Sequence, residues 1–172
     1  MGTPKKPEPV RLFIGMLSEN SKLFSAAASI LTEKFGPVLL ESEIIPFDFT
    51  DYYTPEMGKN LSRKFVAFKR MVSPERLAPI KLFTNRLEET YSQNKKRRIN
   101  LDPGFLTPAR VILASTKDFS HRIYLKSGIY AEITLLFRKG KFETFAWTYP
   151  DYRTEPYLGF FLLLRNMYKK ED

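Results

Sequence analysis

The sequence contains no cysteine and a single histidine, His121. Without cysteine there can be no disulfide bond, thiolate zinc site or cysteine nucleophile, and one imidazole cannot build a multi-histidine metal centre. The sequence also has no GxxxxGK(S/T), GxGxxG or GxSxG motif, which excludes a P-loop, a dinucleotide-binding fingerprint and a nucleophile elbow.

Long hydrophobic runs are lacking as well. The longest, LGFFLLL at 158–164, is far shorter than the roughly 20 residues that cross a bilayer. The opening MGTPKKPEP has no apolar run behind it, unlike a secretory signal, so we expect a cytoplasmic protein. A chain of 172 residues suits one domain. We expect residues 1–9 to form a flexible Pro-rich tail and residues 10–172 a single α+β domain.

Positive charge and aromatic side chains are abundant. Lysine and arginine number 28 against 19 acidic residues, a net charge of +9, and aromatic residues make up 15% of the chain. A positive field favours anionic partners such as phosphorylated molecules and nucleic acids. Alternatively, the excess lysine keeps an aromatic-rich protein in solution. Composition leaves both interpretations open.

Hydrophobic periodicity in the first part of the chain predicts strands alternating with helices. We expect helices at 21–35 and from Ser73 onward, the second either kinked at Pro79 or beginning there, and strands at 10–16, 38–47, 64–72 and 97–102. Proline should end two of these strands, at Pro46 and at Pro103-Gly104, and a helical turn is expected near Thr54 and Pro55. The order strand, helix, strand, strand, helix, strand is that of a ferredoxin-like βαββαβ core.

The second part of the chain predicts a C-terminal β-meander and a final helix. Its strands are expected at 110–116, 121–125, 129–137 and 142–147, and its helix at about 156–170. The helix is apolar over more than one stripe, so it needs cover from two sides, either by a partner subunit, as in a homodimer, or by the sheet and a loop. The predicted fold class is α+β, with an antiparallel sheet.

The first candidate site stretch is IPFDFTDYY at 45–53, where Asp48 and Asp51 stand among rings that include Tyr52. Proline ends the strand there, so both carboxylates are expected on a loop, where such side chains cap turns. If they do more than cap, their partners should be the cations of RRINLD and KDFSHR.

The second stretch, RRINLDPG, places Arg98, Asn100 and Asp102 on one strand face by alternation. An internal salt bridge with exposed ends is the simpler interpretation.

The third stretch is STKDFSHRIYL at 115–125, which contains Lys117, Asp118, His121 and Arg122. Two cations beside an imidazole favour its neutral form and suit a phosphate, although a lone histidine is more often structural.

The fourth stretch, WTYPDYR, contains Tyr149, Asp151, Tyr152 and Arg153. Rings beside a cation can stack a nucleobase or pack a helix against a sheet. Glu132 points away from the apolar face of its strand and is a candidate acid or metal ligand if that face lines a cleft.

Two functions of the candidate site compete, and a third hypothesis is a structural or assembly protein that uses the apolar final helix. The leading hypothesis is a protein that binds a phosphorylated ligand, either a nucleotide, a phosphorylated small molecule or RNA. Its anion contacts would be Arg98, Lys117, His121, Arg122 and Arg153, and its stacking surfaces Tyr52, Tyr149 and Tyr152. The alternative is a metal-dependent phosphoester-cleaving enzyme, with His121 as general base and Asp102 as its catalytic companion. Oxygen ligands for magnesium or manganese would be Asp48, Asp51, Asp102, Asp118, Asp151 and Glu132.

Convergence of Asp51, Arg98, Asp102, His121 and Arg153 on one pocket would favour a functional site, and scatter would count against it.

Five stretches together, PEPVRLFIGML, ESEIIPFDFTDYY, RRINLDPG, LASTKDFSHRIYL and WTYPDYR, resemble an uncharacterised bacterial family. This family is catalogued as domain of unknown function 4416. The resemblance covers nearly the whole chain and implies no particular activity or cofactor.

Overall fold

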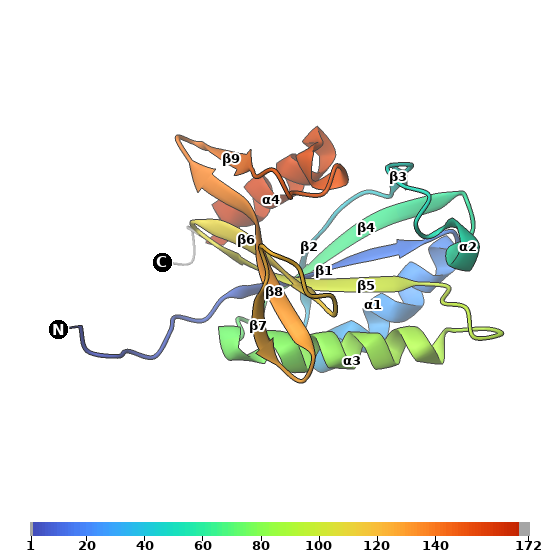
Figure 1. Ribbon diagram of the computed structural model, residues 1–172, viewed down its shortest axis with the longest axis horizontal. Helices are drawn as coiled ribbons and strands as arrows, with labels where there is room; N and C mark the ends of the chain where they lie inside the picture. Colours follow the sequence, from blue (N-terminus) through green and yellow to red (C-terminus); the bar gives the residue numbers. More distant parts are fainter. Residues whose placement is uncertain (1, 169–172) are drawn as a thin grey trace.

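The computed structural model describes residues 2–168. Over these residues the chain forms an open antiparallel sheet of nine strands, in the order β2-β4-β1-β5-β6-β8-β7, with β3 paired to β4 and β9 paired to β8 (Figure 1). The strands are β1 (Arg11–Ser18), β2 (Val38–Glu41), β3 (Ile45–Phe47), β4 (Leu61–Phe68), β5 (Asn100–Thr107), β6 (Arg110–Ser115), β7 (Ile123–Lys126), β8 (Ile129–Arg138) and β9 (Lys141–Thr144). The helices are α1 (Ser21–Phe35), α2 (Thr54–Met57), α3 (Leu77–Thr90) and α4 (Glu155–Tyr168). The predicted α+β class with an antiparallel sheet is confirmed.

Helices cover both faces of the sheet (Figure 1). Alternate residues of β1 point to opposite faces, so that Leu12 and Ile14 pack with α1 and α3, whereas Phe13 packs with α4. All of β1 is buried as a result. Between Tyr53 and Leu61 the chain adds the short α2, so a turn of helix near Thr54 forms as predicted.

Helix α1 forms where the sequence predicts it, at Ser21–Phe35. The Asn20 side chain accepts a hydrogen bond from the backbone N–H of Lys22 and so caps the first turn. Gly36 ends the helix with φ of 94°, a conformation that favours glycine.

The predicted second strand, 38–47, is interrupted. The chain forms β2 and β3 separately, and both pair with β4. Ser42, between them, accepts a hydrogen bond from the backbone N–H of Phe65 at its hydroxyl, 2.9 Å away, which replaces a strand-to-strand bond. The partner strand also differs from the prediction, because β4 runs over Leu61–Phe68 and not over 64–72. Arg63 therefore lies within a strand.

The predicted end of the fourth strand at Pro103-Gly104 is wrong, since β5 continues through both residues to Thr107. Strand β6 pairs with β5 only from Gly104 onward, so Pro103 lies where β5 has a single strand neighbour, β1. At Gly104 an added Cβ would come within 2.4 Å of the Phe13 ring and 2.5 Å of the Ile112 carbonyl oxygen. Glycine here permits close packing and does not mark a turn.

The C-terminal half is not a simple meander, because β8 lies between β6 and β7. The segment 116–122 is long enough to carry the chain past the position of β8 and to place β7 at the edge of the sheet (Figure 1). The strand predicted over 142–147 ends at Thr144 and leaves Trp147 in a loop.

Helix α4 packs one side against the sheet through residues that include Phe160, Phe161 and Leu164, while Leu162 and Leu163 are exposed. The predicted residues 169 and 170 of this helix lie outside the described residues. The homodimer through α4 stays a prediction. Along residues 2–168, none of the helices has the length and hydropathy needed to cross a membrane.

Candidate functional site

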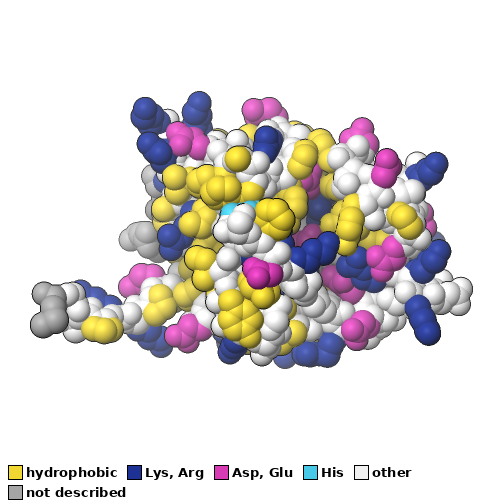
Figure 2. All heavy atoms as spheres, viewed as in Figure 1, with side chains coloured by type: hydrophobic (Ala, Val, Ile, Leu, Met, Phe, Trp, Pro, Cys, Tyr) yellow, Lys and Arg dark blue, Asp and Glu magenta, His cyan; other side chains and the backbone are white. Residues whose placement is uncertain are grey.

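A cavity of about 900 Å³ opens between the β3–α2 loop, helix α3, the 115–119 loop and the 149–152 segment. Figure 2 shows charged side chains of both signs in this hollow, with hydrophobic side chains on either side of it. Strands β4, β5 and β8 supply its floor through Arg63, Asp102 and Glu132. The site therefore depends on elements from nearly the whole length of the chain.

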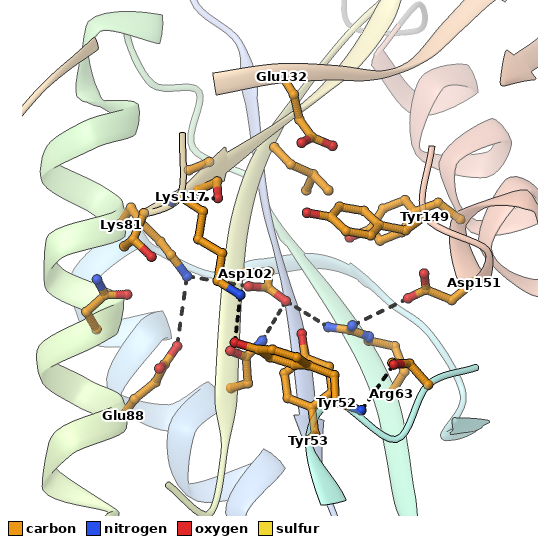
Figure 3. A pocket seen from close by; sticks show the side chains of 18 of the residues that line it. Tyr52, Tyr53, Arg63, Lys81, Glu88, Asp102, Lys117, Glu132, Tyr149 and Asp151 are labelled. Carbon is orange, nitrogen blue, oxygen red and sulfur yellow. Dashed lines mark hydrogen bonds and ion pairs between the residues drawn. The ribbon is translucent and has the colours of Figure 1, made fainter. Parts of the chain in front are cut away.

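Arg63 is the central cation of the floor, with a side chain only 3% exposed. Its guanidinium donates to Asp102 at 3.2 Å, to Asp151 at 3.5 Å and to the Tyr157 hydroxyl at 3.3 Å. Figure 3 shows the guanidinium between the two carboxylates. One buried cation thus joins β4, β5 and the turn that precedes α4.

Helix α3 adds Lys81 and Glu88, two turns apart on one face. The Lys81 ammonium donates to the Leu101 carbonyl at 2.9 Å and to Asp102 at 3.4 Å, and lies 4.0 Å from Glu88. Glu88 in turn accepts from the Leu101 backbone N–H at 2.7 Å. These contacts fasten α3 to β5, and they complete the neutralisation of Asp102.

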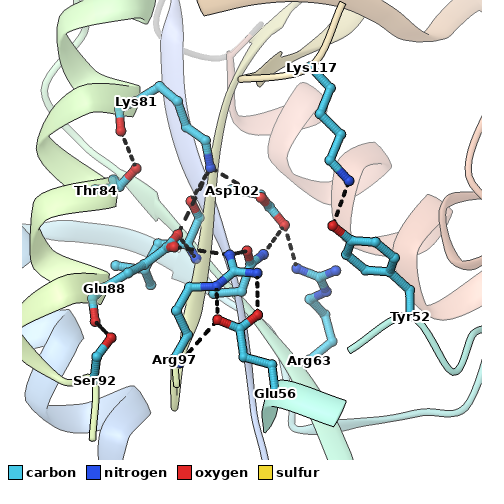
Figure 4. A network of polar contacts seen from close by, with 12 residues as sticks. Tyr52, Glu56, Arg63, Lys81, Thr84, Glu88, Ser92, Arg97, Asp102 and Lys117 are labelled. Carbon is cyan, nitrogen blue, oxygen red and sulfur yellow. Dashed lines mark hydrogen bonds and ion pairs between the residues drawn. The ribbon is translucent and has the colours of Figure 1, made fainter. Parts of the chain in front are cut away.

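Arg97 extends this network at the entrance to β5 (Figure 4). It donates to both carboxylate oxygens of Glu56 at 2.8 Å, to Glu88 at 3.2 Å and to Asn100 at 2.9 Å. The prediction had placed Arg98 on the functional face, but β5 begins only at Asn100, so strand alternation does not extend back to position 98. The remaining pair of that prediction does share a face, since Asn100 donates to Asp102 at 2.6 Å.

The mouth of the cavity is held by contacts between loops. The Lys117 ammonium donates to the Tyr52 hydroxyl at 2.6 Å and lies 4.1 Å from the centre of its ring. Arg122 donates to Glu132 at 2.8 Å and to the Tyr149 hydroxyl at 2.6 Å. Residues far apart in the sequence therefore meet at the rim, as Figure 3 shows for Tyr52 and Lys117.

The carboxyl groups of the floor differ in their electrostatic surroundings. Burial alone would raise the pKa of Asp102, but Lys81 and Arg63 outweigh it, and this pKa lies below its ordinary value. Burial raises the pKa of Glu88 despite Lys81, and the pKa of Asp151 despite Arg63. The cations of the floor therefore stabilise the charged form of Asp102 above all.

Four tyrosines line the cavity: Tyr52, Tyr53, Tyr149 and Tyr152. Burial raises the pKa of Tyr149 to about 12, and it also raises the pKa of Tyr53 and of Tyr152. Tyr52 and Tyr149 accept hydrogen bonds, and the buried hydroxyl of Tyr152 has no partner. Within residues 2–168, none of the four hydroxyls donates a hydrogen bond, so their protons are available to a ligand with acceptor oxygens.

Many of the predicted site residues do line this cavity: Tyr52, Asn100, Asp102, Lys117, Asp118, Arg122, Glu132, Tyr149, Asp151 and Tyr152. The five residues whose convergence on one pocket would favour a functional site do not all line this cavity. All five lie in the described part of the chain, and Asp102 lines the cavity whereas Asp51, Arg98, His121 and Arg153 do not. This scatter counts against a site built from these five residues, although a charged and aromatic cavity exists.

Asp48 and Asp51 lie outside the cavity, and of the rings in their stretch Phe47 is buried while Phe49 and Tyr53 pack beside it. Phe47 packs with Leu17, Met57 and Leu61 in a small core of its own. Both aspartates are exposed, and neither side chain pairs with a cation among residues 2–168. The pairing with the cations of RRINLD and KDFSHR, expected only if these carboxylates do more than cap a turn, does not form among the described residues. The ring of Tyr52 makes the long-range contact instead.

Arg153 and His121 support the site from outside. Arg153 donates to the carbonyl oxygens of Thr148 at 2.8 Å and Ala146 at 3.0 Å, and so holds the loop before Tyr149. The imidazole of His121 lies 3.1 Å from Glu132 and stacks on Trp147. His121 thus holds Glu132, which lines the cavity, and Arg153 holds the loop that leads to Tyr149.

Sequence reasoning missed the cations of the floor, Arg63, Lys81 and Arg97, and their partner Glu88. A signal existed on α3, where Lys81, Thr84 and Glu88 follow one another at helical spacing beside the apolar stripe. The strand predicted over 64–72 left out Arg63, which lies within β4.

The carboxylates proposed as metal ligands are held by arginine and lysine. Asp102 and Asp151 bind Arg63, and Glu132 binds Arg122. In the described part of the chain, no group of three or more histidine, aspartate or glutamate side chains stands in position to hold a metal ion.

The fold and the cavity define an α+β protein whose open antiparallel sheet carries a pocket of paired charges and tyrosine hydroxyls. The sequence matches a family model, Domain of unknown function (DUF4416), over residues 8–168, and the chain belongs to this family. Comparisons with curated proteins and with solved structures found no match.

Proposed function

We propose that this protein binds a small phosphorylated ligand, with its phosphate at Lys117 in the mouth of the cavity. Among the described residues of the lining, Arg63, Lys81, Arg97 and Arg122 each pair with a carboxylate, whereas Lys117 pairs with the hydroxyl of Tyr52. An ammonium group has three donor hydrogens. This unneutralised cation, beside hydroxyls whose protons are unused, is the observation that supports an acceptor-rich anion.

The size of the cavity favours a small molecule over RNA. About 900 Å³ lies within the range of small-ligand sites, whereas a nucleic acid strand needs a positive groove that follows its backbone. Basic clusters do exist at Lys95 and Lys96 and at the β8–β9 turn, Arg138 to Lys141. They lie at opposite ends of the molecule in Figure 1, at the loop before β5 and at the tip of β9. The two clusters therefore do not form a continuous positive groove that a nucleic acid strand could follow.

Paired charges in the floor fit the same proposal. Arg63 and Lys81 offset much of the negative charge of Asp102, Asp151 and Glu88, which lowers the repulsion that an anion at the mouth meets from below. The ligand would replace Tyr52 as the partner of Lys117 and receive hydrogen bonds from Tyr149 and Tyr52. Phosphate contacts of this charge-assisted kind are the stronger class of hydrogen bond.

Replacing Lys117 by alanine is expected to weaken binding of a phosphorylated ligand by about 10-fold or more, because a hydrogen bond to a charged group contributes about 1.5–3 kcal/mol. The measurement is isothermal titration calorimetry, after a thermal-shift screen of sugar phosphates and nucleotides.

The matched control is Lys96→Ala, which removes an exposed lysine from a turn outside the cavity and the same net charge. Equal losses in the two variants would mean that binding depends on overall charge and not on this cavity. A screen in which no phosphorylated compound shifts the melting temperature of the wild-type chain would contradict the proposal itself.

We also infer a ferredoxin-like core in the first part of the fold. Strands β2, β4, β1 and β5 are neighbours in that order, and every pair is antiparallel. Helices α1 and α3 pack into the same apolar cluster on one face. Both features support the βαββαβ arrangement, to which β6, β8 and β7 are added beyond β5.

A further inference from the structure

A column of aromatic rings ends at the mouth of the cavity. Phe145 and Trp147 stack at 4.7 Å with an interplanar angle of 3°, and Trp147 and His121 stack at 5.2 Å with an angle of 9°. Phe119 follows His121 at 5.3 Å, tilted by 57°. Of these four rings, Phe119 is the one that lines the cavity. The column thus leads from the β8–β9 region to the proposed ligand site.

Hydrogen bonds hold the column in place. The Trp147 indole N–H donates to the Ile133 carbonyl at 2.9 Å, and His121 lies 3.1 Å from Glu132, whose side chain is 1% exposed. The carbonyl of Phe119 accepts from the Arg122 backbone N–H at 2.9 Å, which closes the turn that carries the ring. A ring supported in this way loses little conformational freedom when a ligand binds.

Phe119 itself remains 64% exposed, although it is a large apolar ring. Tyr52 and Tyr149, which also line the cavity, are exposed as well, so Phe119 belongs to a group of rings around the mouth and is not an isolated surface residue. Figure 2 shows hydrophobic side chains gathered beside the histidine at this face. An exposed aromatic ring that neighbouring rings support from behind, at the mouth of a cavity, has the properties of a stacking surface for a planar group.

We propose that Phe119 stacks on the nucleobase of the ligand, so that the ligand class is a nucleoside phosphate and not a sugar phosphate. This inference rests on the proposed function, because the phosphate would occupy the site at Lys117. Lys117 and Phe119 are two residues apart on the same loop, and both line the cavity. One loop would therefore present the cation to the phosphate and the ring to the base.

The test compares ribose 5-phosphate with the 5′-monophosphates of adenosine, guanosine, cytidine and uridine by calorimetry on the full chain. Base stacking on an aromatic side chain is sequence-tolerant and large enough for an effect of about 10-fold. We expect at least one nucleotide to bind about 10-fold more tightly than ribose 5-phosphate. In Phe119→Ala that advantage should disappear, whereas the affinity for ribose 5-phosphate should stay unchanged. Phe119→Trp should retain the advantage.

Ile123→Ala is the matched control, since Ile123 is 71% exposed, lies just after the same loop and does not line the cavity. The emission of the single tryptophan, Trp147, checks that the ring column survives in Phe119→Ala and Ile123→Ala. Equal binding of ribose 5-phosphate and all four nucleotides, unaffected by Phe119→Ala, would overturn this inference and leave the proposed function standing. Absence of binding by every phosphorylated probe would overturn both. Binding of a single-stranded oligonucleotide without binding of any mononucleotide would overturn the assignment of a small ligand.

Discussion

Arg63→Met is expected to lower the free energy of unfolding by about 3–5 kcal/mol, the range for removing one partner from a buried ion pair. The guanidinium is 3% exposed and is shared by Asp102, Asp151 and the Tyr157 hydroxyl. Methionine fills much of the volume but leaves two carboxylates without their common cation. The loss should therefore come from uncompensated charge and not from a packing defect. Urea denaturation followed by circular dichroism measures it.

The matched control is Arg138→Met, which removes an arginine whose side chain is 59% exposed and lies 3.7 Å from Glu143. Its cost should stay below about 1 kcal/mol, as for other exposed pairs. Arg63→Lys should fall between the two variants, because lysine keeps the charge but cannot present the planar fork that reaches both carboxylates. If Arg63→Met cost no more than the control, the buried network would not stabilise the fold.

Gly104→Ala is expected to destabilise the protein by about 1–3 kcal/mol or more, the range for overpacking a filled core. The added Cβ would lie 2.4 Å from the Phe13 ring, 2.5 Å from the Ile112 carbonyl oxygen and 2.9 Å from a Leu113 methyl group. The carbonyl belongs to the neighbouring strand, so relief requires β5 and β6 to move apart. Thermal or urea unfolding of the variant measures the cost.

Gly159→Ala gives the opposite expectation for the same chemical change. Gly159 lies inside helix α4, and an added Cβ there meets nothing within 4 Å. Alanine should stabilise the helix by about 0.5–1 kcal/mol, because it restricts the unfolded chain more than glycine does. Similar effects of both substitutions would contradict the view that Gly104 is required by close packing.

Several elements could be predicted because their signals are local. Asn20, the apolar spacing of α1 and Gly36 lie within one short window and define that helix to the residue. The polar-aromatic character of the segments around Tyr52, Lys117 and Tyr149 is equally visible in the sequence, and all three side chains line the cavity. These features do not depend on which strands become neighbours.

Other features could not be predicted, because they depend on strand bounds and on pairing. The face on which a side chain lies changes with a shift of one residue in a strand. Arg97 therefore contributes where Arg98 was expected, and Arg63, just outside the predicted strand, lies at the centre of the floor. Pro103-Gly104 resembles a turn in the sequence, but the close approach of Phe13 and Ile112 explains the glycine.

By itself, the sequence of this protein determined the α+β class, the family, helix α1 and the segments that bear charge beside aromatic rings. Those properties follow from periodicity, caps and residue type, which act over a few neighbouring residues. Only the tertiary structure decided which cations of the described cavity lining pair with carboxylates and that Lys117 pairs instead with the hydroxyl of Tyr52, since each pairing joins residues from different strands and loops. The same holds for the aspartates of IPFDFTDYY: packing of Phe47 against Leu17 and Met57 turned this ring inward, whereas Asp48 and Asp51 stayed in solvent.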